Sequence, residues 1–221
     1  MSLIELTGVT KTYTVGGVSF PALCGVDLKI EEGEFVALMG PSGSGKSTLL
    51  SVLAGLTPPS EGRVVVDGIE VQELDPDRLA AFRSEYVGIV FQQFQLIPYL
   101  TALQNTMLPL SVTGLSGSEQ VRLATEALTR VGLGEKLDRL PNQLSGGEQE
   151  RVAIARAVVN APPILLADEP TGALDTKTGQ EIMGLFAKLH AEGQTIIMVT
   201  HNPENGRQAE RAIVIRDGRL G

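Results

Sequence analysis

The segment Gly40-Pro41-Ser42-Gly43-Ser44-Gly45-Lys46-Ser47 matches the phosphate-loop pattern G-x-x-x-x-G-K-[ST] at every position. Its glycines let backbone N–H groups converge on phosphate oxygens, and a helix N-terminus behind the loop adds further donors. Lys46 supplies a positive charge to the β- and γ-phosphates, and Ser47 supplies a hydroxyl to Mg²⁺. The loop lies between an expected strand at 34–39 and an expected helix at 46–54, which is the context that the motif requires. The alternative, a glycine-rich turn that only caps a helix, is therefore disfavoured, although the loop does not distinguish adenine from guanine.

Two adjacent carboxylates, Asp168 and Glu169, follow the apolar run Ile164–Ala167, 122 residues after Lys46. If this run is a strand beside the phosphate-loop strand, Asp168 lies at the same carboxyl edge of the sheet. There Asp168 can orient Mg²⁺ or its waters, and Glu169 can polarise a water that attacks the γ-phosphate. Such a pair by itself is more typical of a solvated corner, but the phosphate loop favours the catalytic interpretation.

A serine and two glycines, Ser145, Gly146 and Gly147, stand at the start of a second expected helix that reaches Asn160. Residues of these types at a helix start leave N–H groups, a hydroxyl and the helix dipole available to an anion. Taken alone, the stretch Leu144–Glu148 is more typical of an ordinary N-cap. One ATP does not obviously need two separate cradles, so two chains could bring the cradle of one onto the ATP of the other.

Short apolar strands that alternate with helices predict a parallel sheet covered on both faces. One hairpin is expected between strands at 2–14 and 18–30, and a second around the turn Asp67-Gly68. A further strand is expected at 87–91. From about 93 to 160 the pattern becomes helical with loops, and it includes a helix at 118–131 with a 3.6-residue period. The other expected elements are strands at 164–167, 195–200 and 212–215 and helices at 76–85, 175–190 and 203–210.

The composition of the 221 residues, 43% hydrophobic and 20% charged, is typical of a folded chain with a sizeable core. The net charge of −8 argues against a protein whose main role is to wrap nucleic acid or to lie on an anionic membrane. The single cysteine, Cys24, excludes an internal disulfide and a zinc site built on several cysteines, so a reducing compartment is expected. No apolar run approaches the ~18–20 residues of a membrane span and no secretory signal is expected, so a partner would have to supply any span.

Together these motifs resemble those of the ATP-binding-cassette (ABC) ATPases, and the resemblance covers essentially the whole chain in the family's order. It implies one ABC ATPase domain over 1–221 with the α/β fold of the phosphate-loop NTPases. A mainly parallel sheet would form the core, with an N-terminal antiparallel β subdomain and an inserted α-helical subdomain. The core and β subdomain are expected at 1–92 and 161–221, and the helical signature subdomain at 93–160.

The resemblance also implies roles for individual residues, with ATP and Mg²⁺ as cofactors. Mg²⁺ would be held by Ser47, Gln92 and Asp168, and the catalytic residues would be Lys46, Gln92, Glu169 and His201. The residues expected to contact ATP, some of them from the partner chain, are Tyr13, Gly40, Pro41, Ser42, Gly43, Ser44, Gly45, Lys46, Ser47, Thr48, Ser145, Gly146, Gly147 and Asp175.

For some of these residues the sequence leaves an alternative to the role that the resemblance implies. Tyr13 is similar to the family's adenine-stacking aromatic, but it also suits a tyrosine on the surface of a hairpin. Gln93 leaves a one-residue ambiguity beside Gln92. His201 follows a strand end and would hold the γ-phosphate and order Glu169, whereas His190 is expected on the surface of a helix.

Within the family, the stretches 40–48, 90–98 and 167–172 resemble the group that powers lipoprotein release, macrolide export and related mechanotransmission systems. Glu148 and Glu150 stand where glutamines are frequent, and we expect them to change local charge and not the cradle. No C-terminal regulatory domain is expected after the last strand.

The resemblance implies an ATPase that powers a membrane complex from the cytoplasmic face of the cell (inner) membrane. Its partners would be ATP, a second copy in a head-to-tail homodimer and an integral membrane permease. A nucleic-acid-linked cassette is the alternative, but this chain has one phosphate loop, one cysteine and no heptad run. A non-hydrolysing regulator is a further alternative, against which Glu169 and His201 argue.

Overall fold

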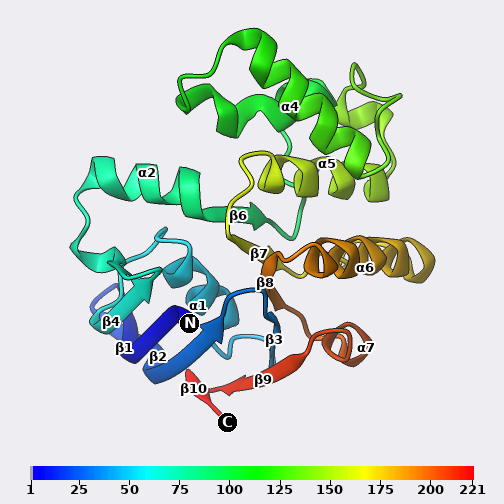
Figure 1. The fold of residues 1–221 in the computed structure, drawn as a ribbon. Coiled ribbons are helices and arrows are strands. Elements are labelled where there is room, and N and C mark those ends of the chain that lie inside the picture. Colours follow the sequence, from blue (N-terminus) through cyan, green and yellow to red (C-terminus); the bar gives the residue numbers. More distant parts are fainter. Residues whose placement is uncertain (1) are drawn as a thin grey trace.

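The computed structural model describes residues 2–221, in which a six-stranded sheet forms the centre (Figure 1). Its strand order is β10-β9-β3-β8-β7-β6, and all neighbours are parallel except the β9–β10 pair. The strands span Phe35–Met39 (β3), Val87–Val90 (β6), Ile164–Asp168 (β7), Thr195–Val199 (β8), Arg211–Arg216 (β9) and Arg219–Leu220 (β10).

Helices cover the central sheet, and several of them gather above it in Figure 1. The α-helices span Lys46–Leu53 (α1), Pro76–Tyr86 (α2), Ala102–Met107 (α3), Gly117–Arg130 (α4), Gly146–Val158 (α5), Thr176–Ala191 (α6) and Pro203–Gly206 (α7). Short 3₁₀ helices span Val71–Glu73 (η1), Leu108–Val112 (η2) and Pro141–Gln143 (η3). Helices α3, α4 and α5 pack on one another, and α5 also contacts β6 and α6. The helical segment therefore reaches the sheet through α5.

The central sheet is buried on both faces because successive side chains of its strands enter two different apolar clusters. Phe35 and Ala37 of β3 pack with the helices that include α5 and α6, while Val36 and Leu38 pack with α1 and the second sheet. All four side chains are at most 1% exposed. The continuous apolar runs in the sequence predicted this arrangement, since a parallel sheet hides both of its faces.

The strand that carries Asp168 is not the direct neighbour of the phosphate-loop strand, so that expectation was wrong. Strand β8 pairs with β3 on one side and with β7 on the other. The run Thr195–Val199 is buried along its whole length, which suits an interior position between two other strands. Both strands still end at the same edge, because β3, β8 and β7 are parallel.

A second sheet of four antiparallel strands lies beside α1, with the order β2-β1-β4-β5. The strands span Ser2–Val15 (β1), Val18–Glu31 (β2), Glu61–Val66 (β4) and Ile69–Glu70 (β5). Both predicted hairpins are present, and Tyr13 of β1 lies opposite Phe20 of β2.

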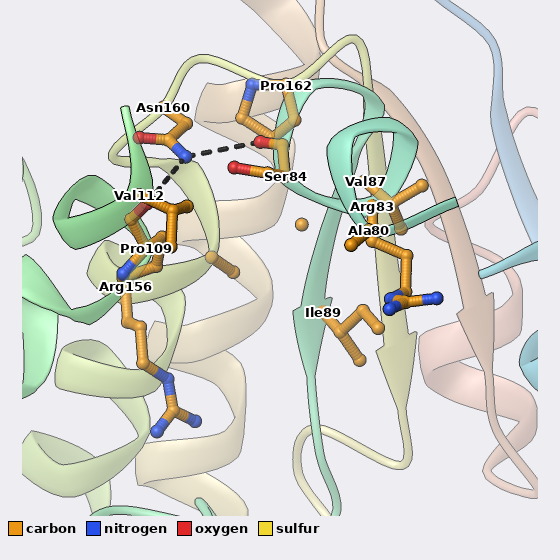
Figure 2. Close-up of a pocket in the computed structure, with 12 residues that line it drawn as sticks. Ala80, Arg83, Ser84, Val87, Ile89, Pro109, Val112, Arg156, Asn160 and Pro162 are labelled. Carbon is orange, nitrogen blue, oxygen red and sulfur yellow. Dashed lines mark hydrogen bonds between the residues drawn. The ribbon is translucent and has the colours of Figure 1, made fainter. Parts of the chain in front are cut away.

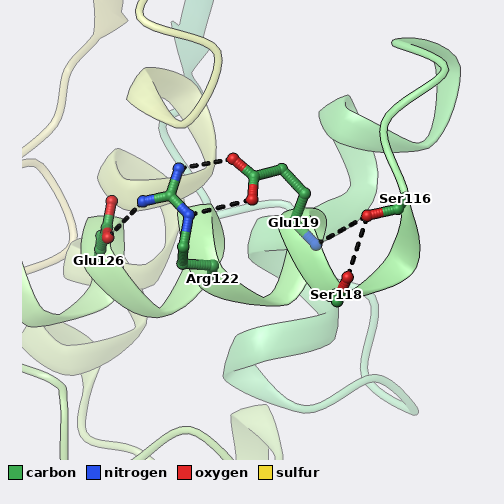
Figure 3. Close-up of polar contacts among 5 residues, drawn as sticks. All are labelled: Ser116, Ser118, Glu119, Arg122 and Glu126. Carbon is green, nitrogen blue, oxygen red and sulfur yellow. Dashed lines mark hydrogen bonds and ion pairs between the residues drawn. The ribbon is translucent and has the colours of Figure 1, made fainter.

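Helix α4 begins at Gly117, slightly earlier than its periodicity predicts, because Ser116 caps it. The Ser116 hydroxyl accepts a hydrogen bond from the Glu119 N–H at 3.3 Å and lies 3.0 Å from the Ser118 hydroxyl (Figure 3). The Arg122 guanidinium then donates to Glu119 on the preceding turn and to Glu126 on the next, each at 2.6 Å. Such pairs three and four residues apart stabilise a helix whose outer face meets water.

Two further expectations differ from the structure. The last helix ends at Gly206, well before residue 210, and β10 follows the turn at Asp217-Gly218 that the sequence did indicate. His190 is partly buried, with 23% of its side chain exposed: its Nε2 lies 2.8 Å from the Gly33 carbonyl oxygen, and its ring packs against Phe35. Among residues 2–221, none of the helices has both the length and the apolar character that a membrane crossing requires.

Glu150 is a buried acid in the middle of α5. Its side chain is 1% exposed, and neither carboxylate oxygen has a hydrogen-bond partner among the described residues. Burial raises the pKa of Glu150 to about 8, although the positive charge of Arg156 acts in the opposite direction. The acid is therefore mostly protonated at neutral pH.

We predict that Glu150 makes the folded chain less stable as the pH rises from about 5 to 8. The unfolded chain releases this proton near the ordinary glutamate pKa of 4.5, whereas the folded chain keeps it until about 8, so stability falls across this window. Each pH unit can cost up to about 1.4 kcal/mol. Urea unfolding of the wild type and of Glu150→Gln at pH 5, 6, 7 and 8 measures the effect. The variant should lack this slope, and parallel curves for the two proteins would contradict the prediction.

Candidate nucleotide site

A cavity of about 550 Å³ opens at the carboxyl edge of the central sheet. It gathers residues that are far apart in the sequence, from β2, from the loop between β3 and α1, from the first turn of α1, and from the ends of β6, β7 and β8. Its lining consists of Ala22, Gly40, Pro41, Ser42, Gly43, Gly45, Lys46, Ser47, Thr48, Gln92, Asp168, Glu169, Val199 and His201. Ala22 and Val199 were not predicted, and no pattern in the sequence marks these apolar wall residues.

Two glycines let the phosphate loop run against neighbouring backbone. Gly40 has φ +148°, and a Cβ placed there would lie 2.1 Å from the Ile215 carbonyl oxygen. Gly45 has φ +107°, and a Cβ there would lie 2.4 Å from the Ala22 carbonyl oxygen. Any other residue would therefore push the loop away from β2 and β9, so both positions require glycine.

Lys46 folds back over the loop that precedes it. Its ammonium group donates to the carbonyl oxygens of Gly40 at 2.9 Å and Pro41 at 2.8 Å. The side chain is 8% exposed, so these hydrogen bonds hold the charge inside the curve of the loop. Ser44, the one predicted phosphate-loop residue outside the lining, is buried, and its hydroxyl has no hydrogen-bond partner within the described part of the chain.

Asp168 reaches the first turn of α1 from the end of β7. The Ser47 hydroxyl donates to Asp168 Oδ1 at 3.4 Å, so two oxygen ligands of the kind that Mg²⁺ prefers lie together. Burial raises the pKa of Asp168 above its usual range, and the hydrogen bond from Ser47 opposes this shift. A cation at this position would favour the charged carboxylate and remove the cost of burying it.

Glu169 and His201 meet across the strand ends of β7 and β8. His201 Nδ1 lies 2.7 Å from Glu169 Oε1, and a proton on that nitrogen makes it the donor to the carboxylate. Glu169 is largely buried, whereas the imidazole is mostly exposed. Glu169 also has a positive φ of 50°, which is uncommon for a residue with a side chain and is typical of functional sites.

Gln92 lines the cavity and Gln93 does not, so the geometry favours Gln92 of the two adjacent glutamines. Gln92 stands two residues after the end of β6 at Val90. Its amide nitrogen lies 3.8 Å from the place where a Cβ on Gly172 would be.

The predicted second cradle does not line this cavity. Ser145 is the N-cap of α5, and its hydroxyl accepts the Glu148 N–H at 3.4 Å. The Thr178 side chain packs so closely on Gly147 that a Cβ there would lie 2.3 Å from its methyl carbon. The start of α6 therefore lies against the start of α5.

Glu148 touches the cradle, so the expectation that it changes only local charge was wrong. Its Oε2 accepts the Ser145 N–H at 2.9 Å, which closes a capping box, and its Oε1 pairs with Lys136. The Lys136 hydrogen bond is the main cause that holds the pKa of Glu148 below its usual range. Glu150 departs from the expectation in another way, because it is buried and its carboxylate oxygens have no hydrogen-bond partner among residues 2–221.

Two further predicted residues also lie outside the cavity lining. Asp175 is exposed and caps α6, where its carboxylate accepts the Thr178 N–H at 3.0 Å and the Thr178 hydroxyl at 2.6 Å. The hydroxyl contact is the main reason why the pKa of Asp175 is lowered. Tyr13 is 39% exposed on β1, with the Lys11 ammonium 5.3 Å from the centre of its ring. These surroundings suit both interpretations of Tyr13, an aromatic ring that stacks on adenine and a tyrosine on the surface of the hairpin.

Comparison with known proteins agrees with this geometry. The family model described as ABC transporter matches residues 23–172. An uncharacterized ABC transporter ATP-binding protein of Methanocaldococcus jannaschii, MJ0796, is 52% identical over 223 residues, which cover 99% of this chain and 95% of the relative. A solved dimer of the MJ0796 cassette in a post-hydrolysis state with ADP and Pi has a TM-score of 0.90 and 50% identity, and the match covers 98% of this chain and 96% of that one. The macrolide export ATP-binding/permease protein MacB of Rhodopirellula baltica is 52% identical over 219 residues, which are 98% of this chain and 32% of that protein.

The chain therefore belongs to the ABC transporter family, within which it is an ATP-binding cassette. The predicted fold class, with its antiparallel β subdomain and helical part, is confirmed, and so is the predicted ATPase. The relatives include macrolide-export proteins, which confirms the predicted resemblance to the group that powers lipoprotein release and macrolide export.

We predict that Lys46→Ala nearly abolishes ATP hydrolysis and weakens ATP binding. The variant lacks the ammonium group that Lys46 brings to the cavity lining, together with its two hydrogen bonds to the loop carbonyls. Phosphate release and nucleotide titration on the purified variant measure both effects, with thermal melting to establish that it folds. Normal turnover by a folded Lys46→Ala chain would contradict the assignment of the phosphate loop.

Proposed function

We propose that the chain is the ATPase subunit of a membrane transport or mechanotransmission complex and acts as a head-to-tail homodimer. One observation carries this proposal. The cavity gathers the phosphate loop, Asp168, Glu169 and His201, whereas the Ser145–Gly147 cradle of the same chain stays outside it. A second copy in head-to-tail orientation would bring its cradle to the γ-phosphate, and the solved dimers of MJ0796 support a dimer.

Within the 1–221 domain, we assign 1–92 and 161–221 to the core with its β subdomain and 93–160 to the helical subdomain. Tyr13 would stack on adenine, and Asp175 would reach the dimer interface from the start of α6. Ser145 and Gly147 would contact the γ-phosphate that the partner chain binds. The Ser145 hydroxyl and the N–H groups at the start of α5 suit an anion.

Mg²⁺ fits the oxygen atoms at the edge of the sheet. Ser47 and Asp168 would hold the ion, and Gln92 would contribute an amide oxygen from the end of β6. When bound, the ion neutralises charge on the phosphate oxygens. The raised pKa of Asp168 supports this assignment, because a buried carboxylate without a cation is costly to ionise.

Hydrolysis would rest mainly on positioning and on charge stabilisation. Glu169 would orient the attacking water and accept its proton, since its carboxylate lines the cavity beside the phosphate loop. His201 would hold the γ-phosphate and fix Glu169 through their 2.7 Å contact. Lys46 would turn from the loop carbonyls to the phosphates as ATP replaces those contacts.

A membrane permease is the partner that we propose for the segment after Gln92. Ile97 is 42% exposed and Tyr99 is 87% exposed, whereas Leu96 packs on the core. The buried Asn105 side chain fixes the backbone below them, since it accepts the Ile97 N–H and donates to the carbonyl oxygens of Ile97 and Leu100. A rigid loop that presents apolar side chains to solvent suits a protein partner.

The complex would work on the cytoplasmic face of the inner membrane, with the permease as the membrane-spanning part. The net charge of −8 argues against nucleic acid as the partner. The relative MacB is described as an ATP-binding/permease protein, and this supports a permease as the membrane partner of this chain. The nature of the cargo would be set by that partner.

We predict that Glu169→Gln separates ATP binding from hydrolysis. The amide keeps the size of the acid but cannot accept a proton, and losing a catalytic base costs on the order of 10²–10⁴ in rate. The closed dimer should therefore accumulate as an ATP-dependent shift from one chain mass to two in size-exclusion chromatography with Mg²⁺.

Lys46→Ala serves as the control and should not shift. A Glu169→Gln variant that hydrolyses ATP within about twofold of wild type would remove Glu169 as the base. A variant that stays monomeric in saturating ATP would contradict the role of Ser145 and Gly147 across the dimer.

We predict that Ile97→Ser with Tyr99→Ser reduces the amount of this chain retained on membranes that contain its partner. The paired change Val15→Ser with Val18→Ser is the matched control, because these side chains are 68% and 56% exposed on the β1–β2 hairpin. Sedimentation of membranes after expression measures retention. Equal loss in both variants, or loss in neither, would contradict docking at this segment.

A further inference from the structure

Arg156 of α5 holds the backbone of the segment that follows Gln92. Its guanidinium donates to the carbonyl oxygen of Phe94 at 2.7 Å and to that of Gln95 at 2.6 Å. The Arg156 side chain is partly buried, and this burial lowers the pKa of its guanidinium from the usual value. Hydrogen bonds from a charged donor are about twice as strong as neutral ones.

The two residues that Arg156 binds have unusual backbone conformations. Phe94 has φ 58° and Gln95 has φ 50°, so two successive residues with side chains adopt the left-handed region. Such conformations persist only where the surroundings hold them. Arg156 stabilises them, because two of its N–H groups bind the two carbonyl oxygens at the same time.

The same segment is attached to α5 at a second point. The tip of the Phe94 ring lies 3.8 Å from the place where a Cβ on Gly146 would be, at the first turn of the helix. Gln92 stands only two residues before Phe94, and its side chain enters the nucleotide cavity. The position of Gln92 is therefore tied to α5 through Phe94 and Arg156.

Arg156 also lines a different cavity, of about 320 Å³, between α2–β6 and η2–α5. In Figure 2 Arg156 and Asn160 lie on one side of this cavity and Val87 and Ile89 on the other. The Asn160 amide bridges the Ser84 and Pro109 carbonyl oxygens at 3.2 and 3.3 Å but does not contact the Gln92 segment. Asn160 therefore provides a matched control for Arg156.

We propose that Arg156 is a positioning residue for ATP hydrolysis, which fixes the Phe94-Gln95 turn and so aims Gln92 into the nucleotide cavity. This inference rests on the proposed function of Gln92. It assigns Arg156 no contact with ATP, and its effect passes through Gln92 alone.

A double-mutant cycle between Arg156→Met and Gln92→Ala tests the proposal. Arg156→Met should lower kcat by about 10- to 100-fold, the cost typical of a misplaced catalytic group. The KM for ATP should change less, because the phosphate loop is intact. In the Gln92→Ala background, Arg156→Met should lower kcat by less than about twofold, since a residue that acts through another adds nothing once that residue is gone.

Two further variants distinguish positioning from a loss of packing. Arg156→Lys keeps the charge but lacks the fork that reaches both carbonyl groups, so it should restore only part of kcat. Asn160→Ala removes two hydrogen bonds in the same cavity and should leave kcat near wild type. Melting temperatures of all variants establish that they fold, and a destabilised Arg156→Met is replaced by Arg156→Gln.

The outcomes separate this inference from the proposed function. If Gln92→Ala itself leaves kcat unchanged, the proposed role of Gln92 fails, and the inference fails with it. If Gln92→Ala impairs hydrolysis but Arg156→Met does not, only the inference fails. Equal losses from Arg156→Met in both backgrounds would also overturn it, because they would show that Arg156 acts independently of Gln92.

Discussion

The parallel register of four neighbouring strands is the constraint on which the site depends. In the order β3, β8, β7 and β6, these strands end one beside the other at a single edge of the sheet. The phosphate loop follows β3, His201 follows β8, the Asp168-Glu169 pair closes β7, and Gln92 follows β6. Because parallel strands share one carboxyl edge, residues up to 161 positions apart reach one cavity. The two apolar faces of the sheet keep this edge rigid, since both are buried against helices or the second sheet.

The helical segment adds groups that the edge of the sheet lacks, and it adds them in two places. Arg156, near the C-terminal end of α5, binds the Phe94 and Gln95 carbonyl oxygens, and the Phe94 ring lies against Gly146 at the start of the same helix. The Ser145 cap at that start stands against the start of α6 and away from the cavity of its own chain. One helix thus carries both the hold on Gln92 and the cradle proposed for a partner's ATP. In this account a movement of α5 shifts both the Gln92 segment and the cradle. Closure of the dimer is thereby linked to the alignment of Gln92 in the nucleotide cavity.

Local patterns in the sequence predicted the features that depend on neighbouring residues. The phosphate loop, the capped start of α5 and the apolar strands are of this kind, because spacing and residue type determine them directly. The order of strands was not predictable in the same way: nothing near Thr195–Val199 indicates that β8 lies between β3 and β7. The packing of His190 against Phe35, the burial of Glu150 and the hold of Arg156 on Phe94 and Gln95 also depend on residues distant in sequence. Such contacts come from the packing of whole elements, which a single sequence without its fold does not reveal.

The central claim is that each ATP site needs residues from two chains, and mixing two inactive variants tests it most directly. Lys46→Ala damages the phosphate loop but leaves the cradle intact, and Ser145→Glu places a negative charge in the cradle but leaves the loop intact. A mixed dimer has one site in which both halves are unaltered. The account predicts that each variant alone is inactive and that the mixture hydrolyses ATP. A mixture as inactive as its components, although mixed dimers form, would contradict a site shared between chains.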